Sequence, residues 1–395
     1  MKSIEIFAFM KPLPPFLLFL LFSLLFLPTC NNNENRTTFP KINALIDSVR
    51  NQYVPDMRDD VYEVSVSLCK GKPILRGVTS VAEAKTDLLH RISKFQPDVV
   101  DSISVLPDEH TNGIIIGVAN VSVADLRTAP SYAAEMATQL LLGTQMQILQ
   151  GNQGWFRVKT PEGYVAWINN STVAGMNRND FTQWHSAPKI IFTDNYGFAY
   201  ETPDENRQTV SDLAFGNLLK WEGEQGRFYW VSYPDGRQAY ILKTQSRMFS
   251  NWKASLRLTE ESIVQKALGL KGIPYSWGGT SAKAMDCSGF TKTVYLKHGI
   301  VLKRDASQQA QTGIPVDINE GYQYLRAGDL LFFGKKRVRH VAIYIGNLEF
   351  IHAAGFVRIN SLDPEQPHYD RENTTELMSA RRIIGAVGTE GIWEL

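Results

Sequence analysis

The sequence predicts a multidomain α+β protein, with a small α+β domain, two small β-barrels and a C-terminal α+β domain. Three observations support this prediction. The chain has 395 residues, which is too long for one compact core. A stretch of short, glycine-punctuated strands repeats itself in the middle of the chain. The last third begins with helical patterns and continues with strands, which is an α+β plan.

The N-terminus has the layout of an export signal. Lys2 and Lys11 precede an uncharged apolar run over residues 16–27, which is shorter than the roughly 20 residues of a membrane-spanning helix. The following Leu-Pro-Thr-Cys resembles a bacterial lipoprotein box, although Thr29 differs from the usual Ala, Gly or Ser. We expect residues 1–29 to be a lipoprotein signal peptide, Cys30 to be lipidated and residues 30–39 to be a tether. A plainly cleaved or retained signal is the alternative, and either one exports the chain.

Residues 40–112 are expected to form the small α+β domain. Apolar residues at helical spacing occupy 42–49, residues 60–79 alternate around a turn, residues 80–95 return to helical spacing, and residues 99–107 close as a strand. The order helix, strand, strand, helix, strand resembles the envelope-associated BON domains in pattern alone. No catalytic constellation is visible here, so a spacer or adaptor role is expected. Cys69 is interpreted as a small strand residue.

The two barrels are expected at residues 113–178 and 179–250. Residues 140–168 and 213–242 share one order of cues: a Leu-x-x-Gly turn at Gly143 or Gly216, an aromatic strand, a Pro-x-Gly hairpin and a closing strand. Matched positions such as Trp155 and Trp230 lie 75 residues apart, which is the length of a whole small domain. Both segments resemble bacterial SH3-like domains.

Cys287 is the candidate nucleophile of the last domain, residues 251–395. It lies at the expected start of a helix, and two histidines, His340 and His352, lie on expected strands of the same domain. A helix N-terminus and a neighbouring imidazolium both lower a thiol pKa, so we expect Cys287 to be activated by both. One imidazole would act as base and the other would hold that base in the right tautomer.

The placement of the two histidines depends on the hairpin between them. Residue 346 is their midpoint, so an odd-length loop centred there would put them directly opposite on one face of the sheet. An even-length loop would put them on opposite faces.

The motifs "PYSWGG", "DCSGF", "HVAIYIG" and "IHA" together resemble the NlpC-type papain-like cysteine peptidases of bacterial cell walls. This resemblance covers about residues 258–390. With two SH3-like barrels in front, the chain resembles the γ-D-glutamyl-L-diamino acid endopeptidases (the dipeptidyl-peptidase VI type), and this wider resemblance begins near residue 114. It implies hydrolysis of the γ-D-glutamyl-L-Lys or γ-D-glutamyl-diaminopimelate bond of murein peptides with a free N-terminal L-Ala, in cell-wall turnover or recycling.

The resemblance also implies roles for individual residues. Cys287 matches the nucleophile, His340 the general base, His352 the orienting residue and Tyr275 the oxyanion-site tyrosine. Pocket-wall and substrate-contact positions match Trp277, Asp286 and Ser288, and an acid that captures the substrate amine matches Asp305. Ala306 stands where some relatives have serine. In the first barrel, Glu135 and Tyr164 are expected to reach the cleft.

Several alternatives remain open at this stage. Cys287, His340 and His352 could ligate zinc, although no close pair of ligands supports this, and no metal or cofactor is expected. The chain could hydrolyse polymeric peptidoglycan with its barrels as wall-binding modules, or be a non-catalytic envelope-binding lipoprotein. The net charge of +1 argues against nucleic-acid binding. We expect a monomeric, membrane-anchored lipoprotein of the bacterial cell envelope whose partners are murein peptides and the membrane.

Overall fold

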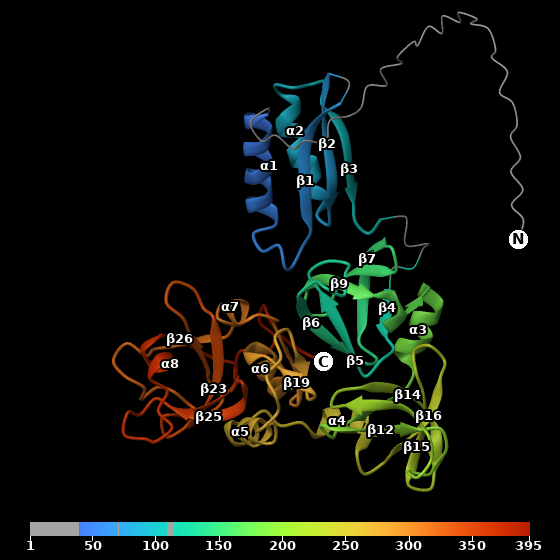
Figure 1. The fold of residues 1–395 in the computed structure, drawn as a ribbon, viewed down its shortest axis with the longest axis vertical. Helices are drawn as coiled ribbons and strands as arrows, with labels where there is room; N and C mark the ends of the chain where they lie inside the picture. The colour runs from blue at the N-terminus through green and yellow to red at the C-terminus, as the bar shows by residue number, and fades with distance from the viewer. Residues whose placement is uncertain (1–38, 70, 109–113, 115) are drawn as a thin grey trace, which may run out of the picture.

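The computed structural model describes residues 39–69, 71–108, 114 and 116–395. The expected signal peptide and Cys30 therefore lie outside the described residues. Within the described part of the chain, no helix is long and apolar enough to cross a membrane. The elements form the multidomain α+β architecture predicted from the sequence, and Figure 1 shows four successive units along the chain.

The first unit is a three-stranded sheet with two helices on one face. Its elements are α1 (Pro40–Tyr53), β1 (Tyr62–Cys69), β2 (Lys72–Thr79), α2 (Ala82–Ser93) and β3 (Val100–Val105), in the order predicted. The central strand β2 pairs antiparallel with β1 and parallel with β3, so α2 is the crossover that a parallel pair requires. Apolar residues of both helices form one core with Val66, Leu75 and Ile103 of the sheet.

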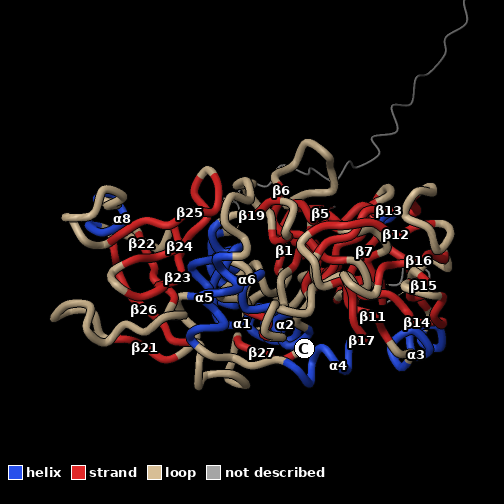
Figure 2. The backbone as a smooth tube through the Cα atoms, turned by 90° about the horizontal axis from the view of Figure 1, so that it is seen from below, coloured by secondary structure: helices blue, strands red, loops and turns tan. Residues whose placement is uncertain are grey.

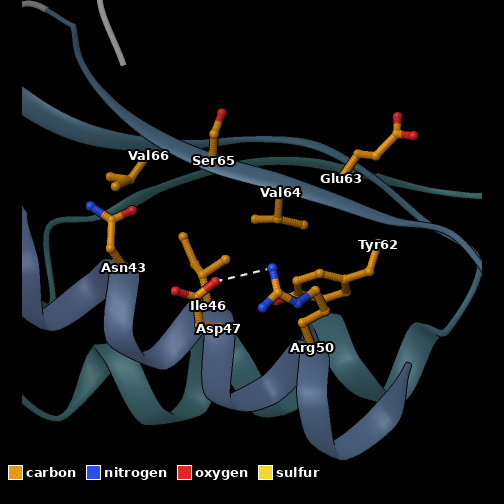
Figure 3. Close-up of a pocket in the computed structure, with 9 residues that line it drawn as sticks. All are labelled: Asn43, Ile46, Asp47, Arg50, Tyr62, Glu63, Val64, Ser65 and Val66. Atoms are coloured by element: carbon orange, nitrogen blue, oxygen red, sulfur yellow. Dashed lines mark ion pairs between the residues drawn. The ribbon is translucent and has the colours of Figure 1, made fainter. Parts of the chain in front are cut away.

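A groove of about 260 Å³ lies in this first unit between α1 and β1. Figure 3 shows Arg50 on α1 turned toward Asp47, with which it forms an ion pair at 3.2 Å, while Tyr62 and Val64 line the strand side. None of the residues expected at the active site lines this groove.

The two barrels repeat one topology. The first contains β4 (Ile116–Ala119), β5 (Val123–Arg127), β6 (Met136–Leu141), β7 (Gln145–Asn152), β8 (Trp155–Lys159), β9 (Val165–Asn169) and β10 (Val173–Met176), with a 3₁₀ turn at Asn170–Thr172. The second contains β11 (Lys189–Phe192), β12 (Tyr196–Tyr200), β13 (Thr209–Ala214), β14 (Leu218–Gln225), β15 (Phe228–Ser232), β16 (Gln238–Leu242) and β17 (Ser246–Met248). Their strand orders, β10-β4-β7-β8-β9-β5-β6 and β17-β11-β14-β15-β16-β12-β13, correspond strand for strand.

Short helices join the barrels to their neighbours. Helix α3 (Arg178–Ser186) lies between the barrels, and α4 (Phe249–Ser255) leads into the last unit. Gly143 and Gly216, the paired turn residues recognised in the sequence, both have positive φ (83° and 88°), which explains why each turn uses glycine.

The last unit packs helices against a six-stranded sheet, in the order β21-β26-β22-β23-β24-β25. Its elements are α5 (Glu260–Leu268), β18 (Thr280–Ser281), β19 (Ala284–Met285), α6 (Cys287–Leu296), β20 (Ile300–Leu302), α7 (Ala306–Gln309), β21 (Ile314–Val316), β22 (Leu330–Phe333), β23 (His340–Gly346), β24 (Glu349–Ala354), β25 (Phe356–Ser361), α8 (Arg371–Thr375), β26 (Leu377–Arg382) and β27 (Ile392–Glu394). Figures 1 and 2 show α6 between the sheet and the barrels. One core joins apolar residues of α5 and α6 to the inner face of the sheet.

Candidate active site

Cys287 is the first residue of α6, as the sequence predicts, and it is a buried free thiol. Asp286 is the N-cap of the helix, and its carboxylate accepts a hydrogen bond of 2.7 Å from the Gly289 amide. The first turn packs closely on the preceding loop: a Cβ atom at Gly289 would lie 1.9 Å from the carbonyl oxygen of Gly279. Glycine at position 289 therefore allows the helix start, and with it the thiol, to lie directly on the "YSWGG" loop.

The electrostatic surroundings of Cys287 differ from those expected. Burial, followed by the negative charge of Asp286, raises the pKa of the Cys287 thiol to about 12. The backbone amides of Val341 and Ser288 and the charge of Arg304 act in the opposite direction but do not outweigh these two effects. The expectation of a lowered thiol pKa is therefore wrong for this state of the protein, because the thiol is buried beside a carboxylate.

The two histidines meet on one face of the sheet. His340 begins β23 and His352 lies in β24, and His340 Nε2 is 2.7 Å from His352 Nδ1. Their register is not the one expected: Ile343 pairs with Ile351, and continuing this pairing places His352 opposite Ala342. The histidines are therefore diagonal neighbours, and their rings bridge the offset of two residues.

A β-bulge keeps the two rings on the same face. The hairpin turns through two residues, Asn347 and Leu348, which both have positive φ (52° and 62°), so the loop itself has an even length. The register shifts between Tyr344 and Gly346, which inserts one extra residue into β23. This insertion compensates for the even-length turn and returns His340 to the face that carries His352.

Asn360, which the sequence analysis missed, completes the chain of polar groups. Its Oδ1 lies 3.0 Å from His352 Nε2, while its amide nitrogen donates to the carbonyl of His368 at 3.2 Å. The amide orientation thus requires His352 to donate from Nε2 and accept at Nδ1. His340 must then donate from Nε2, so its Nδ1 is left with a lone pair. Arg358 is the cross-strand partner of His352, and Asn360 follows it by two residues on the same face of the sheet. A polar residue at this spacing is the sequence signal that could have revealed Asn360.

Both imidazoles are neutral in this arrangement. Burial, reinforced by the neighbouring ring of His352, lowers the pKa of His340 to about 3. Burial also lowers the pKa of His352 to about 4, although its hydrogen bond to Asn360 acts in the opposite direction. A neutral His352 is what the chain of hydrogen bonds needs, because a proton on its Nδ1 would face the Nε2–H group of His340, whereas His340 Nδ1 stays free to accept a proton.

The loop before Cys287 brings two further expected residues together with the first barrel. Burial, followed by the charges of Cys287 and Asp286, raises the pKa of Tyr275, so its phenol lies within electrostatic range of both groups. Trp277 is 61% exposed, and its indole N–H donates to Glu135 Oε1 at 2.5 Å. Glu135 and Trp277 therefore join the first barrel to the loop before Cys287.

Asp286 and Ser288 lie on either side of Cys287 but are buried rather than open to a cleft. Arg304, a residue the sequence analysis missed and only 1% exposed, donates to Asp286 Oδ2 at 2.6 Å and to Ser288 Oγ at 2.8 Å. The Gly278 amide also donates to Asp286 at 3.0 Å. These hydrogen bonds therefore fix the backbone on both sides of Cys287.

Tyr164 and Asp305 form the second meeting point of barrel and peptidase domain. Burial, followed by the charge of Asp305, raises the pKa of the Tyr164 phenol. Asp305 precedes α7 as its N-cap, directly after Arg304, and Ala306 begins the helix. A third domain also reaches this point, because Arg58 of the first unit donates to Asp305 Oδ2 at 2.8 Å.

The arrangement of the histidines does not resemble a metal centre. Among the residues that the structure describes, no group of three His, Cys, Asp or Glu side chains could hold a metal ion. The direct contact of 2.7 Å between the two imidazoles occupies the atoms that a shared ion would need.

Comparison with known proteins agrees with this geometry. Residues 272–377 match the NlpC/P60 family, and residues 126–173 match the bacterial dipeptidyl-peptidase SH3 domain. The chain is 29% identical over 265 residues to the gamma-D-glutamyl-L-lysine dipeptidyl-peptidase of Bacillus cereus, covering 64% of this chain and 76% of the relative. It is 26% identical over 281 residues to dipeptidyl-peptidase 6 of Lysinibacillus sphaericus, covering 67% of this chain and 97% of the relative.

One solved structure has a similar fold over about two thirds of this chain. An NlpC/P60 family protein from Bacillus cereus superposes with a TM-score of 0.59 at 26% identity, over 68% of this chain and 99% of that chain. The fold and the site thus define a cysteine peptidase with SH3-like domains in front of its peptidase domain. The NlpC/P60 match lies within its C-terminal domain, which confirms the resemblance found in the sequence.

Proposed function

We propose that this cysteine peptidase hydrolyses the bond between γ-D-glutamate and an L-diamino acid in murein peptides that carry a free N-terminal L-Ala. The observation that carries this proposal is the meeting of barrel and peptidase domain around the thiol. Glu135 contacts Trp277 in the loop before Cys287, and Tyr164 lies close enough to Asp305 for its charge to raise the pKa of the phenol, so the first barrel meets the peptidase domain at two carboxylates. The names of the Bacillus and Lysinibacillus relatives support the same reaction class.

Cys287 and His340 start the reaction as a neutral pair. His340 Nδ1 takes the thiol proton while the sulfur attacks the γ-carbonyl carbon, and His352 holds the imidazole in the tautomer that this transfer needs. The same proton then passes to the nitrogen of the diamino acid as it leaves. Water hydrolyses the remaining thioester and returns the thiol. Because burial keeps the thiol protonated, the proton transfer accompanies substrate binding and is not completed beforehand.

Tyr275 supports the oxyanion that forms during attack. Its phenol is close enough to Cys287 for the charge of the thiolate to raise its pKa, and the raised pKa keeps the phenol protonated and able to donate. The amide of Ser288, at the N-terminus of α6, is a second donor of the kind that stabilises an oxyanion.

Glu135 and Asp305 select the substrate by its amine. A carboxylate attracts an ammonium and loses this interaction when the nitrogen is acylated. Peptides released from the glycan, which have a free L-Ala, are therefore expected to be better substrates than peptides still linked to muramic acid.

The test compares L-Ala-γ-D-Glu-L-Lys with its N-acetylated form. We expect acetylation to lower kcat/KM by about 10-fold or more, since a hydrogen bond to a charged group is worth about 1.5–3 kcal/mol. The Cys287→Ala variant should lose activity on the order of 10³-fold or more. Equal rates on both peptides would exclude amine recognition, and efficient cleavage of intact murein would favour a hydrolase of the polymer. Unchanged hydrolysis by Cys287→Ala would point to a non-catalytic binding protein.

We further propose that the chain is attached to the bacterial cell envelope through a lipid on Cys30. The apolar run and the Leu-Pro-Thr-Cys box support this. Mass spectrometry of the mature N-terminus should find a diacylated cysteine at position 30. The Cys30→Ser variant should move from the membrane fraction to the soluble fraction, and detection of an unmodified N-terminus on the wild-type protein would refute the attachment.

A further inference from the structure

One arginine of the first unit, Arg58, contacts Asp305, a carboxylate proposed above to bind the substrate amine. The segment between α1 and β1, residues 54–61, is called the Arg58 loop here, and Figure 1 shows it pointing at α7 and β9. Arg58 Nη1 donates to Asp305 Oδ2 at 2.8 Å and to Ser307 Oγ at 3.0 Å. A guanidinium therefore occupies the carboxylate to which the substrate ammonium is expected to bind.

The position of the guanidinium is fixed by its own loop. Asp56 accepts from Arg58 Nε at 2.8 Å and from Nη2 at 2.7 Å, so the planar group is held with Nη1 turned toward Asp305. The carbonyl of Arg58 accepts from the Val165 amide at 2.6 Å, directly after Tyr164. The backbone of the Arg58 loop is thus attached to the first barrel beside Tyr164, while the Arg58 side chain binds Asp305.

Asp305 connects this contact to the thiol. It follows Arg304, which is bonded to both neighbours of Cys287 in the sequence, Asp286 and Ser288. An ammonium that arrives at Asp305 would approach the positive charge of Arg58 and share a carboxylate that this residue already engages. Both effects weaken the binding of a cation, because like charges a few ångströms apart repel and the acceptor oxygen is already in use.

The contact between the first unit and the rest of the protein is mainly polar. Three further polar contacts hold the Arg58 loop: Lys303 with Asp59 at 2.8 Å, Lys159 with Asp60 at 2.9 Å, and Gln308 with Asp56 at 3.0 Å. The apolar part is a small cluster that includes Val61, Leu106 and Leu149. Interfaces of this kind are typical of domains that shift relative to each other.

Resting on the proposed function, we propose that Arg58 is a specificity-determining residue supplied by the first unit, which competes with the substrate ammonium for Asp305. It acts through Asp305 and not on the reacting atoms. The amine preference of the enzyme then depends on how the first unit docks against the first barrel and the peptidase domain.

The experiment measures kcat and KM of the full chain on L-Ala-γ-D-Glu-L-Lys and on its N-acetylated form. For Arg58→Ala we expect KM for the free peptide to fall about 5-fold or more with kcat unchanged, while kcat/KM for the acetylated peptide stays within about 2-fold. Arg58→Lys keeps a cation near Asp305 and should behave closer to the wild type. Arg50→Ala, the same substitution at an ion pair on α1, is the matched control and should change neither value.

Three results would overturn the inference. These are an unchanged ratio of the two kcat/KM values in Arg58→Ala, a rise in KM for the free peptide, and an equal shift in the Arg50→Ala control. Failure of the proposed function looks different, because the wild type itself would then not distinguish the free from the acetylated peptide. A circular dichroism spectrum identical to that of the wild type shows that Arg58→Ala is folded.

Discussion

The two barrels have one topology and two different tasks. The Pro-x-Gly hairpin of the first barrel runs from Thr160 to Tyr164 and contacts the peptidase domain, where Glu162 forms an ion pair with Lys292. The corresponding hairpin of the second barrel runs from Tyr233 to Arg237, and Arg237 donates to the carbonyl of Asn120 in the first barrel at 2.5 Å. The same structural element thus docks each barrel onto a different neighbour.

The connection before the third strand of each barrel differs in the same way. The Thr128 amide donates to the carbonyl of Glu135 in the first barrel. The Glu201 amide donates to the carbonyl of Gln208 in the second, so Glu135 and Gln208 are equivalent positions. Both side chains are exposed, but Glu135 accepts a hydrogen bond from Trp277 of the peptidase domain. The barrel topology thus supplies the position, and the side chain at that position determines whether the barrel contacts the peptidase domain there.

The largest expected difference between the barrels concerns their hairpin acids. Glu162 is buried with Lys292, whereas Asp235 pairs with Arg237 at 2.8 Å near the surface. Breaking a buried pair leaves an uncompensated charge, so Glu162→Gln should destabilise the protein by about 3 kcal/mol. Asp235→Asn should cost less than about 1 kcal/mol. Urea midpoints at constant slope measure both, and equal shifts would contradict the comparison.

The paired turn glycines give the next largest difference. A Cβ atom at Gly143 would lie 2.3 Å from the backbone oxygen of Leu218 in the other barrel, whereas one at Gly216 would lie 2.8 Å from the flexible side chain of Leu141. Gly216→Ala should cost about 1–2 kcal/mol for its left-handed backbone. Gly143→Ala should cost about 1 kcal/mol more, because the barrels must separate. Thermal unfolding of the two variants side by side checks this order.

Substitutions at the equivalent positions Glu135 and Gln208 compare the effects of the two barrels on substrate binding. Glu135→Gln should raise KM for the free tripeptide by about 10-fold, because one charged partner of the ammonium is lost. Gln208→Glu places a carboxylate at the equivalent position of the second barrel and should leave KM within about 2-fold. A similar effect of both substitutions would mean that long-range charge, and not the contact with Trp277, determines binding.

The smallest change is expected from acidification. The pKa of His340 is lowered to about 3, so the imidazole keeps its role as a neutral base below the ordinary imidazole value of about 6.5. Between pH 5.5 and 7.5, kcat/KM for the acetylated peptide should therefore change by less than about 2-fold. A steep fall of kcat/KM as the pH drops through about 6.5 would show that the imidazole titrates at its ordinary pKa.

Much of this architecture could be predicted from local sequence patterns. The thiol at a helix start, the histidine strands and the repeated barrels all depend on short-range signals such as periodicity and glycine turns. The bulge in β23 could not be predicted, because strand parity depends on one inserted residue. Arg304 and Asn360 were missed since their roles appear only when distant segments pack together. The pKa of Cys287 was predicted in the wrong direction because burial is a property of the tertiary structure.

The bulge between Tyr344 and Gly346 also limits how this hairpin can evolve or be engineered. Adding or deleting a single amino acid between the two histidines would turn one ring to the other side of the sheet, whereas a change of two would restore it. Length variation in active descendants of this gene should therefore occur in even steps. A redesign that straightens the strand must lengthen the turn by one residue at the same time.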